Sequence, residues 1–416
     1  MGSLSSKGKK HQDTSKYGDI YLQTDKTAYH PGETVTGTIF LNLISEFPGN
    51  ELFLKFKGKQ AAHIVKKQRR GKYQFEIKYS EKDKIIKESV LVHSWDKLST
   101  GQFSIPFSFL PHEFLPASFY QQGHRYLAFI EYQIEAFLKP HKETDPKMKY
   151  KQPINLRNKI VPVTGNLTSN VTTALKTCCC CKQGSNFLKA NFEKNYYSPG
   201  EKAQVTMELD NSGTSLKNKN VVFGLGQWLE ITAAGKTLRT HTTKVKQQLP
   251  GIPSGSTKNA GTLNVVLPQF PTKADFKEID KNNPSKWVLL RLRDNNNVIT
   301  STTSSTLMSS SYHLEVTCPM SGCCTTLPIA QIPIGIYSPD IQLPTVTAPA
   351  NWQPIALDSI TLAFPYSQNQ PMQSEANGQM VEGQMIQNDM PQNQLNVEMA
   401  QISMPQSNQY NQDYYK

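Results

Sequence analysis

The amino-acid sequence predicts an all-β protein made of two tandem antiparallel β-sandwiches, with a disordered N-terminal arm and a disordered C-terminal tail. Three observations predict this fold. Short segments rich in Val, Ile, Thr, Tyr and Phe recur between clusters of Gly, Pro and Asn. No long stretch keeps a helical period, and one turn sequence occurs twice. Short strands at this spacing are typical of β-sandwiches.

The expected strands of the first half follow one another closely. They cover residues 20–23, 34–43, 52–56, 73–77, 102–109 and 126–138. The segment 34–43 shows the alternation most clearly, because its polar and apolar residues occupy opposite faces of an extended chain. Each expected strand therefore has one face available for a core.

A repeated turn indicates that the chain contains the same domain twice. The matching residues are Lys26, Tyr29, Pro31, Gly32 and Glu33 against Lys194, Tyr197, Pro199, Gly200 and Glu201. The offset is constant at 168 residues (194 − 26). Pro followed by Gly makes a tight reversal, so each copy predicts a strand, a turn and a second strand. A second similarity pairs residues 132–136 with residues 312–316.

The repeat and the local composition predict five segments. The composition changes after about residue 346, and 12 Gln and 7 Asn occur among the 51 residues of 366–416. Such a segment buries too little apolar surface to fold. The predicted segments are a disordered basic arm (1–16), an N-terminal sandwich (17–163), a linker with a cysteine run (164–185), a C-terminal sandwich (186–345) and a disordered Gln/Asn/Met-rich tail (346–416).

Composition and charge exclude several classes of protein. The apolar runs are far shorter than the roughly 18–20 residues that span a bilayer. The 7 cysteines are odd in number and clustered, unlike the disulfide framework of a secreted domain, so a reducing cytoplasmic environment is expected. The motifs of metalloproteases, serine hydrolases and P-loop enzymes are absent from the sequence. We therefore expect no enzyme activity and no cofactor.

Motifs in a fixed order carry a resemblance to a known family. They are Tyr29-His30-Pro31-Gly32-Glu33 with the strand at 37–39, the stretch 103–111 leading to Leu115-Pro116-Ala117-Ser118-Phe119, the junction 176–181, Tyr197-Ser198-Pro199-Gly200-Glu201 with Asp210-Asn211-Ser212, and finally Ser310-Ser311-Tyr312 and Leu327-Pro328-Ile329. This set, spread over about 17–345, resembles the arrestin superfamily, and most of all the α-arrestin (arrestin-domain-containing) adaptors.

The resemblance implies two cupped sandwiches that act as a non-enzymatic scaffold. Such a scaffold binds cytoplasmic regions of membrane proteins and recruits trafficking machinery for endocytosis or endosomal sorting, on the plasma membrane or on endosomes. The tail departs from the α-arrestin pattern, because in place of a Pro-Pro-x-Tyr motif it offers only Phe364-Pro365-Tyr366. A structural, retromer-like coat subunit without direct cargo selection is the alternative.

The N-terminus fits the pattern for N-myristoylation. Gly2 follows the initiator Met and Ser6 stands at the favoured position. One myristoyl chain binds a bilayer only marginally, and Lys7, Lys9 and Lys10 would supply the second, electrostatic signal. Gly2 is therefore a candidate lipidation site, and a plain solvated arm is the alternative.

The stretch 51–90 carries much of the net charge of +12, with 12 basic and 5 acidic residues. It predicts a surface for an anionic partner, either lipid headgroups or a phosphorylated cargo segment. The candidate residues are Lys66, Lys67, Arg69, Arg70 and Lys72. A solvated hairpin loop is the alternative. Nucleic acid is not expected, since the stretch has no interleaved stacking aromatics on a recognisable module and no Gly-rich phosphate loop.

The cysteines form two clusters. They are Cys178, Cys179, Cys180 and Cys181 in the linker, and Cys318, Cys323 and Cys324 near the end of the second sandwich. In an extended chain at most two of four consecutive side chains point to one side, so a tetrahedral zinc site would need thiolates from both clusters. Three interpretations stay open: a structural zinc site between the clusters, S-acylation of the exposed run, and unligated cysteines.

Overall fold

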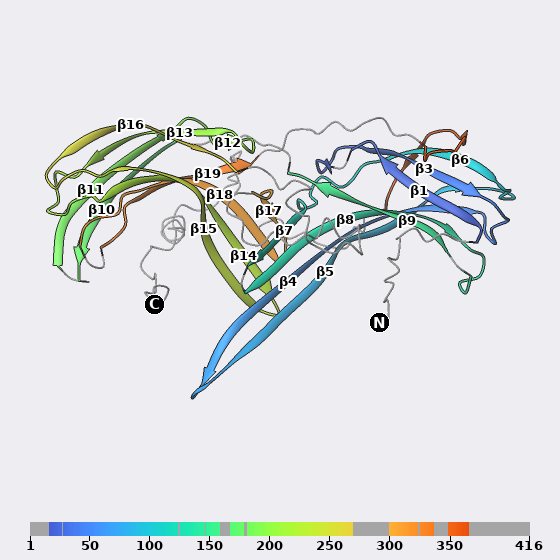
Figure 1. Cartoon of the computed structure of the whole chain (residues 1–416), viewed down its shortest axis with the longest axis horizontal. Helices are drawn as coiled ribbons and strands as arrows, with labels where there is room; N and C mark the ends of the chain where they lie inside the picture. Colours follow the sequence, from blue (N-terminus) through green and yellow to red (C-terminus); the bar gives the residue numbers. More distant parts are fainter. Residues whose placement is uncertain are drawn as a thin grey trace, which may run out of the picture. The chain divides into compact units, whose positions relative to one another are not determined.

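The structure is a computed structural model, and it confirms the predicted fold class of two β-sandwiches (Figure 1). It describes residues 16–26, 28–123, 125–145, 147–158, 167–178, 181–268, 299–322, 325–336 and 348–365. Every regular element in these residues is a β-strand. Among the same residues, no helix is long and apolar enough to cross a membrane.

The first sandwich consists of two facing sheets. One contains, in spatial order, β1 (Gly18–Thr24), β3 (Val35–Leu43) and β6 (Gly101–Phe109). The other has the order β2 (Ala28–Tyr29), β9 (Met148–Leu156), β8 (Tyr126–Lys139), β4 (Glu51–Arg70) and β5 (Tyr73–Ser94), with β7 (Phe119–Gly123) also paired to β8. Most pairs are antiparallel, as the short turns between consecutive strands require.

The second sandwich repeats this topology, and one of its sheets has an additional strand at the edge. One sheet has the order β10 (Thr168–Thr177), β11 (Cys181–Phe192), β13 (Lys202–Asp210) and β16 (Thr257–Val266). The other has the order β12 (Tyr196–Tyr197), β19 (Ile329–Ile336), β18 (Met308–Thr317), β14 (Asn220–Ala233) and β15 (Lys236–Pro250), with β17 (Thr303–Ser304) paired to β18. Strand for strand, β12, β19, β18, β14 and β15 correspond to β2, β9, β8, β4 and β5.

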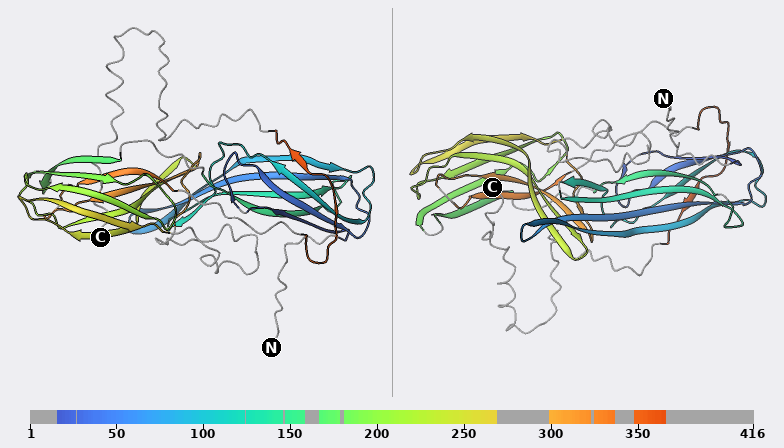
Figure 2. Two further views of the ribbon diagram at one scale, coloured as in Figure 1. Left: turned by 90° about the horizontal axis from the view of Figure 1, so that it is seen from above. Right: turned by 60° about the horizontal axis from the view of Figure 1, so that its bottom comes forward.

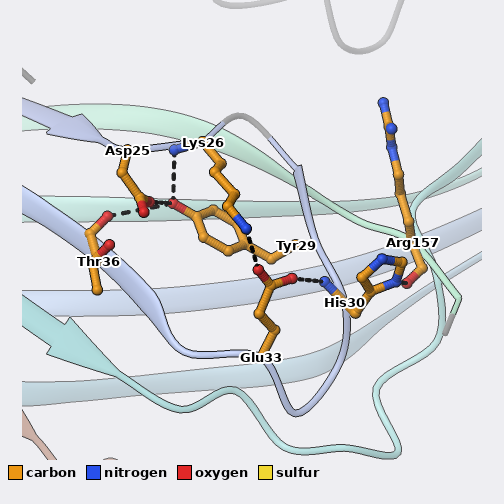
Figure 3. A network of polar contacts seen from close by, with 7 residues as sticks. All are labelled: Asp25, Lys26, Tyr29, His30, Glu33, Thr36 and Arg157. Atoms are coloured by element: carbon orange, nitrogen blue, oxygen red, sulfur yellow. Dashed lines mark hydrogen bonds and ion pairs between the residues drawn. The ribbon is translucent and has the colours of Figure 1, made fainter. Parts of the chain in front are cut away.

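The repeated turn forms a polar network in the first sandwich (Figure 3). The Tyr29 hydroxyl donates a hydrogen bond to Asp25 Oδ1 and accepts one from the Lys26 N–H at 3.1 Å. Lys26 Nζ forms an ion pair with Glu33 Oε1 at 2.5 Å, and Gly32 supplies the positive φ of 78° that the reversal requires. Burial and the Asp25 carboxylate raise the pKa of Tyr29, which stays neutral as a donor.

The second copy of the turn has nearly the same geometry. Lys194 forms an ion pair with Glu201, and Gly200 again has a φ of 78°. The other carboxylate oxygen of Glu201 accepts a hydrogen bond from the Ser198 N–H at 2.8 Å, as that of Glu33 does from the His30 N–H. The sequence repeat therefore corresponds to a repeated structure, in which the Glu side chain closes the turn.

Alternating side chains fill the cores of both sandwiches. On β8, Tyr132 and Ile134 are fully buried, and their counterparts on β18 are Tyr312 and Leu314. The Tyr132 hydroxyl donates to the Pro116 carbonyl at 2.7 Å, so its polar end is satisfied inside the core. The opposite faces of β8 and β18 are left for polar side chains.

The predicted linker contains structure that the sequence did not indicate. β10 and β11 form an antiparallel pair across residues 168–191, so regular structure of the second sandwich begins well before residue 186. β10 has a weak pattern because only one of its side chains, Leu175, is buried. Its stability comes from backbone hydrogen bonds at a sheet edge, which leave little signal in the sequence.

The prediction of a disordered tail from residue 346 is wrong for its first part. Residues 348–365 are described, and β20 (Ile355–Ala356) and β21 (Ile360–Leu362) run parallel to β6 at the edge of the first sandwich (Figure 2). Leu362 and Phe364 are buried in the core of that sandwich. The Phe364 ring lies 5.1 Å from that of Phe109.

We predict that Phe364→Ala releases this segment from the first sandwich. A buried Phe→Ala change costs about 3–5 kcal/mol, and here that figure is an upper limit because the segment can detach instead of leaving a cavity. The variant should show a lower free energy of unfolding in urea. Limited proteolysis should cleave within 348–365 at least tenfold faster than in the parent chain.

The exposed Ile355, on the same segment, provides the matched control. Its side chain is 65% exposed, so Ile355→Ala should leave both measurements unchanged. Equal proteolysis of Phe364→Ala and the parent chain would contradict the docking of this segment.

Candidate functional site

The β4–β5 hairpin extends beyond the sheet to which it belongs (Figure 1). β4 pairs with β8 only over 51–64, but it continues to Arg70 in pairing with β5. The outer part of the hairpin therefore has no partner strand except its own, and residues 66–76 are all exposed. We call residues 66–78 the hairpin tip.

A two-residue turn closes the hairpin. Arg70 pairs with Tyr73, so Gly71 and Lys72 form the loop. Gly71 has a φ of 62° at the first loop position, where glycine avoids the steric cost that a side chain would have. The Arg69 guanidinium also donates to the Gly71 carbonyl at 3.1 Å. The tip is thus held by its own backbone pairing and turn.

The hairpin tip brings together the residues predicted to bind an anionic partner. Lys66, Lys67, Arg69 and Arg70 lie on β4, and Lys72 lies in the turn. None of these five forms an ion pair with any described residue, although Glu76 lies opposite Lys67. The tip therefore carries positive charge that this sandwich does not neutralise.

Two lysines in the inner part of the same basic stretch differ, because they form ion pairs. On the face of the sheet opposite the core, Lys57 forms an ion pair with Glu135 and Lys59 with Glu131. Burial also lowers the pKa of Lys59. Lys57 and Lys59 are thus neutralised within the sheet, whereas Lys82, Lys84 and Lys87 on β5 are exposed like the residues of the hairpin tip.

Two aromatic side chains at the hairpin tip were missed by the sequence analysis. Tyr73 is 69% exposed and Phe75 is 41% exposed. In the register of the hairpin, Arg70 lies opposite Tyr73 and Gln68 opposite Phe75, so the aromatic rings share one face with basic and polar residues. Their spacing of two residues, which places both rings on one face of an extended strand, was the sequence signal that could have found them.

The structure brings the flanks of the two cysteine clusters together. Thr177 precedes the first run and Gly322 precedes Cys323, and a Cβ built on Gly322 would lie 3.1 Å from Thr177 Cγ2. Cys178 and Cys181 are exposed. Cys179, Cys180, Cys323 and Cys324 lie outside the described residues, as does Gly2, so the zinc, acylation and myristoylation predictions stay predictions.

Cys318 differs from the other described cysteines, because it is part of the core. Its side chain is fully buried among the apolar residues of the second sandwich. Burial raises the pKa of its thiol to about 12, which suppresses the thiolate that a metal or an electrophile requires. Cys318 therefore packs as part of the apolar core of the second sandwich.

Comparison with known protein families found a match for each sandwich. The family model described as Arrestin (or S-antigen), N-terminal domain matches residues 18–161. The model described as Arrestin (or S-antigen), C-terminal domain matches residues 182–341. A search of curated proteins found no match.

We predict that Cys318 is unreactive in the folded protein. At pH 8, a thiol with a pKa of about 12 holds roughly one part in ten thousand as thiolate, and burial also excludes the reagent. Iodoacetamide should therefore modify Cys318 only in denaturant, as peptide mass spectrometry can measure. Cys181, in the same EDTA-treated sample, is the control and should react in the native state. Equal native rates at Cys181 and Cys318 would contradict the burial of this thiol.

Proposed function

Because the chain belongs to the arrestin family, we propose that it is a non-enzymatic trafficking adaptor. In this role the two sandwiches bind cytoplasmic regions of membrane-protein cargo, at the cytoplasmic face of the plasma membrane or of endosomes, and recruit trafficking machinery. An adaptor of this kind must hold a membrane surface and a protein at the same time. The proposal therefore requires a surface suited to a bilayer.

The hairpin tip is the observation that supports the proposal most directly. It is exposed, its five predicted basic residues have no ion-pair partner among the described residues, and it extends past the sheet. Anionic lipids attract basic side chains within about a Debye length. A basic element that projects from a rigid sandwich can reach a membrane while the rest of the domain stays clear of it.

The aromatic residues favour a membrane over a phosphorylated peptide as the partner of the tip. Basic side chains alone suit either partner, since both present phosphate oxygens. Exposed Tyr73 and Phe75 bury apolar surface in the boundary between headgroups and acyl chains. A phosphopeptide does not require exposed aromatic rings beside the charges.

Gly2 would supply the second membrane signal. A single acyl chain binds only marginally, so stable attachment requires a second contribution such as a basic patch. In this chain the patch would come from the lysines at 7, 9 and 10 and from the hairpin tip. The two signals are separable by mutation.

We predict that the variant Lys66→Gln, Lys67→Gln, Arg69→Gln and Arg70→Gln binds anionic vesicles more weakly. Each basic residue near an anionic surface contributes about 1 kcal/mol, so the affinity should fall at least tenfold and at most about a thousandfold. Flotation with vesicles containing phosphatidylserine, over a salt series, measures this. The residual binding should depend less on salt.

A charge-matched control removes four other exposed lysines, those at 182, 202, 217 and 219 in the second sandwich. It should retain the parent affinity, and Tyr73→Ala with Phe75→Ala should weaken binding without changing its salt dependence. Unchanged vesicle binding by the four-residue tip variant would contradict the membrane assignment. If the four-residue tip variant lost phosphopeptide binding instead, the hairpin tip would be a binding surface for phosphorylated cargo.

We predict that Gly2→Ala moves the protein from the membrane fraction to the soluble fraction of its own cells. The change removes the acceptor of the acyl chain and leaves the tip intact, so vesicle binding of the unacylated protein should not change. Proximity labelling should report membrane proteins around the parent chain and fewer around Gly2→Ala. Intact-mass analysis showing an unmodified N-terminus in the native protein would contradict lipidation.

A further inference from the structure

Three polar side chains meet on the face of the second sandwich opposite its core. His313 and Glu315 lie on β18, where Tyr312 and Leu314 alternate with them into the core. His241 comes from β15. The Nε2 atoms of the two histidines are 3.0 Å apart, and Glu315 Oε2 lies 3.3 Å from His313 Nε2 and 3.7 Å from His241 Nε2. His313 and Glu315 are almost completely buried.

A glycine on the intervening strand makes this meeting possible. β14 separates β15 from β18, and Gly226 on β14 pairs with His313. A Cβ at Gly226 would lie 2.2 Å from His313 Nε2 and 2.8 Å from His241 Nε2. The two imidazoles therefore meet above the backbone of β14, in space that any larger residue would fill. The Trp228 ring, whose centroid lies 4.5 Å from that of His241, packs beside them.

The first sandwich has different residues at the corresponding positions. Glu135 corresponds to Glu315, and Lys57 corresponds to Gly226 in the register of the sheet. Lys57 neutralises Glu135 through an ion pair. In the second sandwich the lysine is missing, and no described lysine or arginine forms an ion pair with Glu315. A buried carboxylate requires a positive partner, and the groups that face it are imidazoles.

The three side chains are of the types that coordinate metal ions. A metal ion binds a carboxylate in its ionised form and an imidazole in its neutral form, so binding here would release any proton that the three groups share.

We propose that His241, His313 and Glu315 bind one divalent transition-metal ion, of which zinc fits best. Ligand atoms around a tetrahedral ion with bonds of about 2.0–2.1 Å are roughly 3.3 Å apart, and the three separations here are 3.0, 3.3 and 3.7 Å. Two imidazoles disfavour calcium and magnesium, which take oxygen ligands. With three protein ligands, water or a side chain of a bound partner would supply the fourth.

The groups around the ligands set the expected affinity. Thr243 Oγ1 donates to Glu315 Oε1 at 3.2 Å and holds the carboxylate in place. His313 Nδ1 is buried and has no hydrogen-bond partner among the described residues. Loss of such an outer partner typically weakens a metal site by about 10–100-fold. We therefore expect weaker zinc binding here than at a site with complete outer contacts.

The experiment must separate this site from the cysteine clusters. All six cysteines at 178–181, 323 and 324 are changed to Ser, while the core residue Cys318 is kept, and folding is checked by circular dichroism. Titration with Zn²⁺ and Co²⁺ should then give one ion per chain. His241→Ala and His313→Ala in this background should each weaken binding at least about tenfold. His63→Ala, a histidine of the first sandwich, is the matched control and should bind as the background does.

Spectroscopy identifies the ligands independently of the variants. X-ray absorption at the zinc edge should show only nitrogen and oxygen neighbours, and Zn²⁺ should raise the unfolding temperature of the background but not that of Glu315→Gln. Absence of zinc binding by the folded cysteine-free background would overturn the proposal, whether or not the histidine variants fold. Unchanged binding by both His241→Ala and His313→Ala would overturn it as well.

Discussion

The burial of one face of each long strand is the constraint on which the rest of the structure depends. Two sheets can share a core only if alternate side chains point into it, so the other face of each strand is free to carry polar groups. β8 shows both consequences. Its Tyr132 and Ile134 fill the core, and Glu135, between Ile134 and Ala136, faces away from it and pairs with Lys57. The cores of the two sandwiches are alike because packing leaves few alternatives, whereas the opposite faces have diverged.

Because the same fold occurs twice in the chain, the outward faces of the two sandwiches can be compared position by position. The same strand order and the same turn occur twice, and the closing contacts of the turn, from Lys26 to Glu33 and from Lys194 to Glu201, are preserved. Outward positions then differ in kind, most clearly where Lys57 corresponds to Gly226. A lysine in the first sandwich neutralises a carboxylate directly, while Gly226 in the second leaves space that two imidazoles occupy. A glycine in place of a long side chain thus leaves the carboxylate to other partners, while the core beneath it is alike in both sandwiches.

Local sequence patterns predicted the fold well, because each strand requires a turn at its end and alternating apolar side chains for the core. The Pro-Gly turns, the alternation in 34–43 and the buried tyrosines of β8 and β18 all follow from short-range chemistry. The elements that were missed lie at sheet edges. The segment 348–365 is fixed by backbone pairing with β6 and by two apolar side chains, too few to give a period. The length of the hairpin of β4 and β5 was underestimated because the outer part of β4, residues 66–70, is polar on both faces and shows no alternation. The outer part of β5 does alternate, and it predicted only the short strand 73–77.

The candidate sites were predictable to the degree that their residues are neighbours in the chain. The basic residues of the hairpin tip lie within a few positions of one another, so composition alone located them. The cluster around Glu315 is different, because His241 precedes His313 by 72 residues and reaches it only through the register of β14 with both of its neighbours. The sequence contains the pair His313 and Glu315 with the spacing of two that puts them on one face, but that pattern is common. The side chains can meet because Gly226, on another strand, has no side chain to fill the space above its backbone.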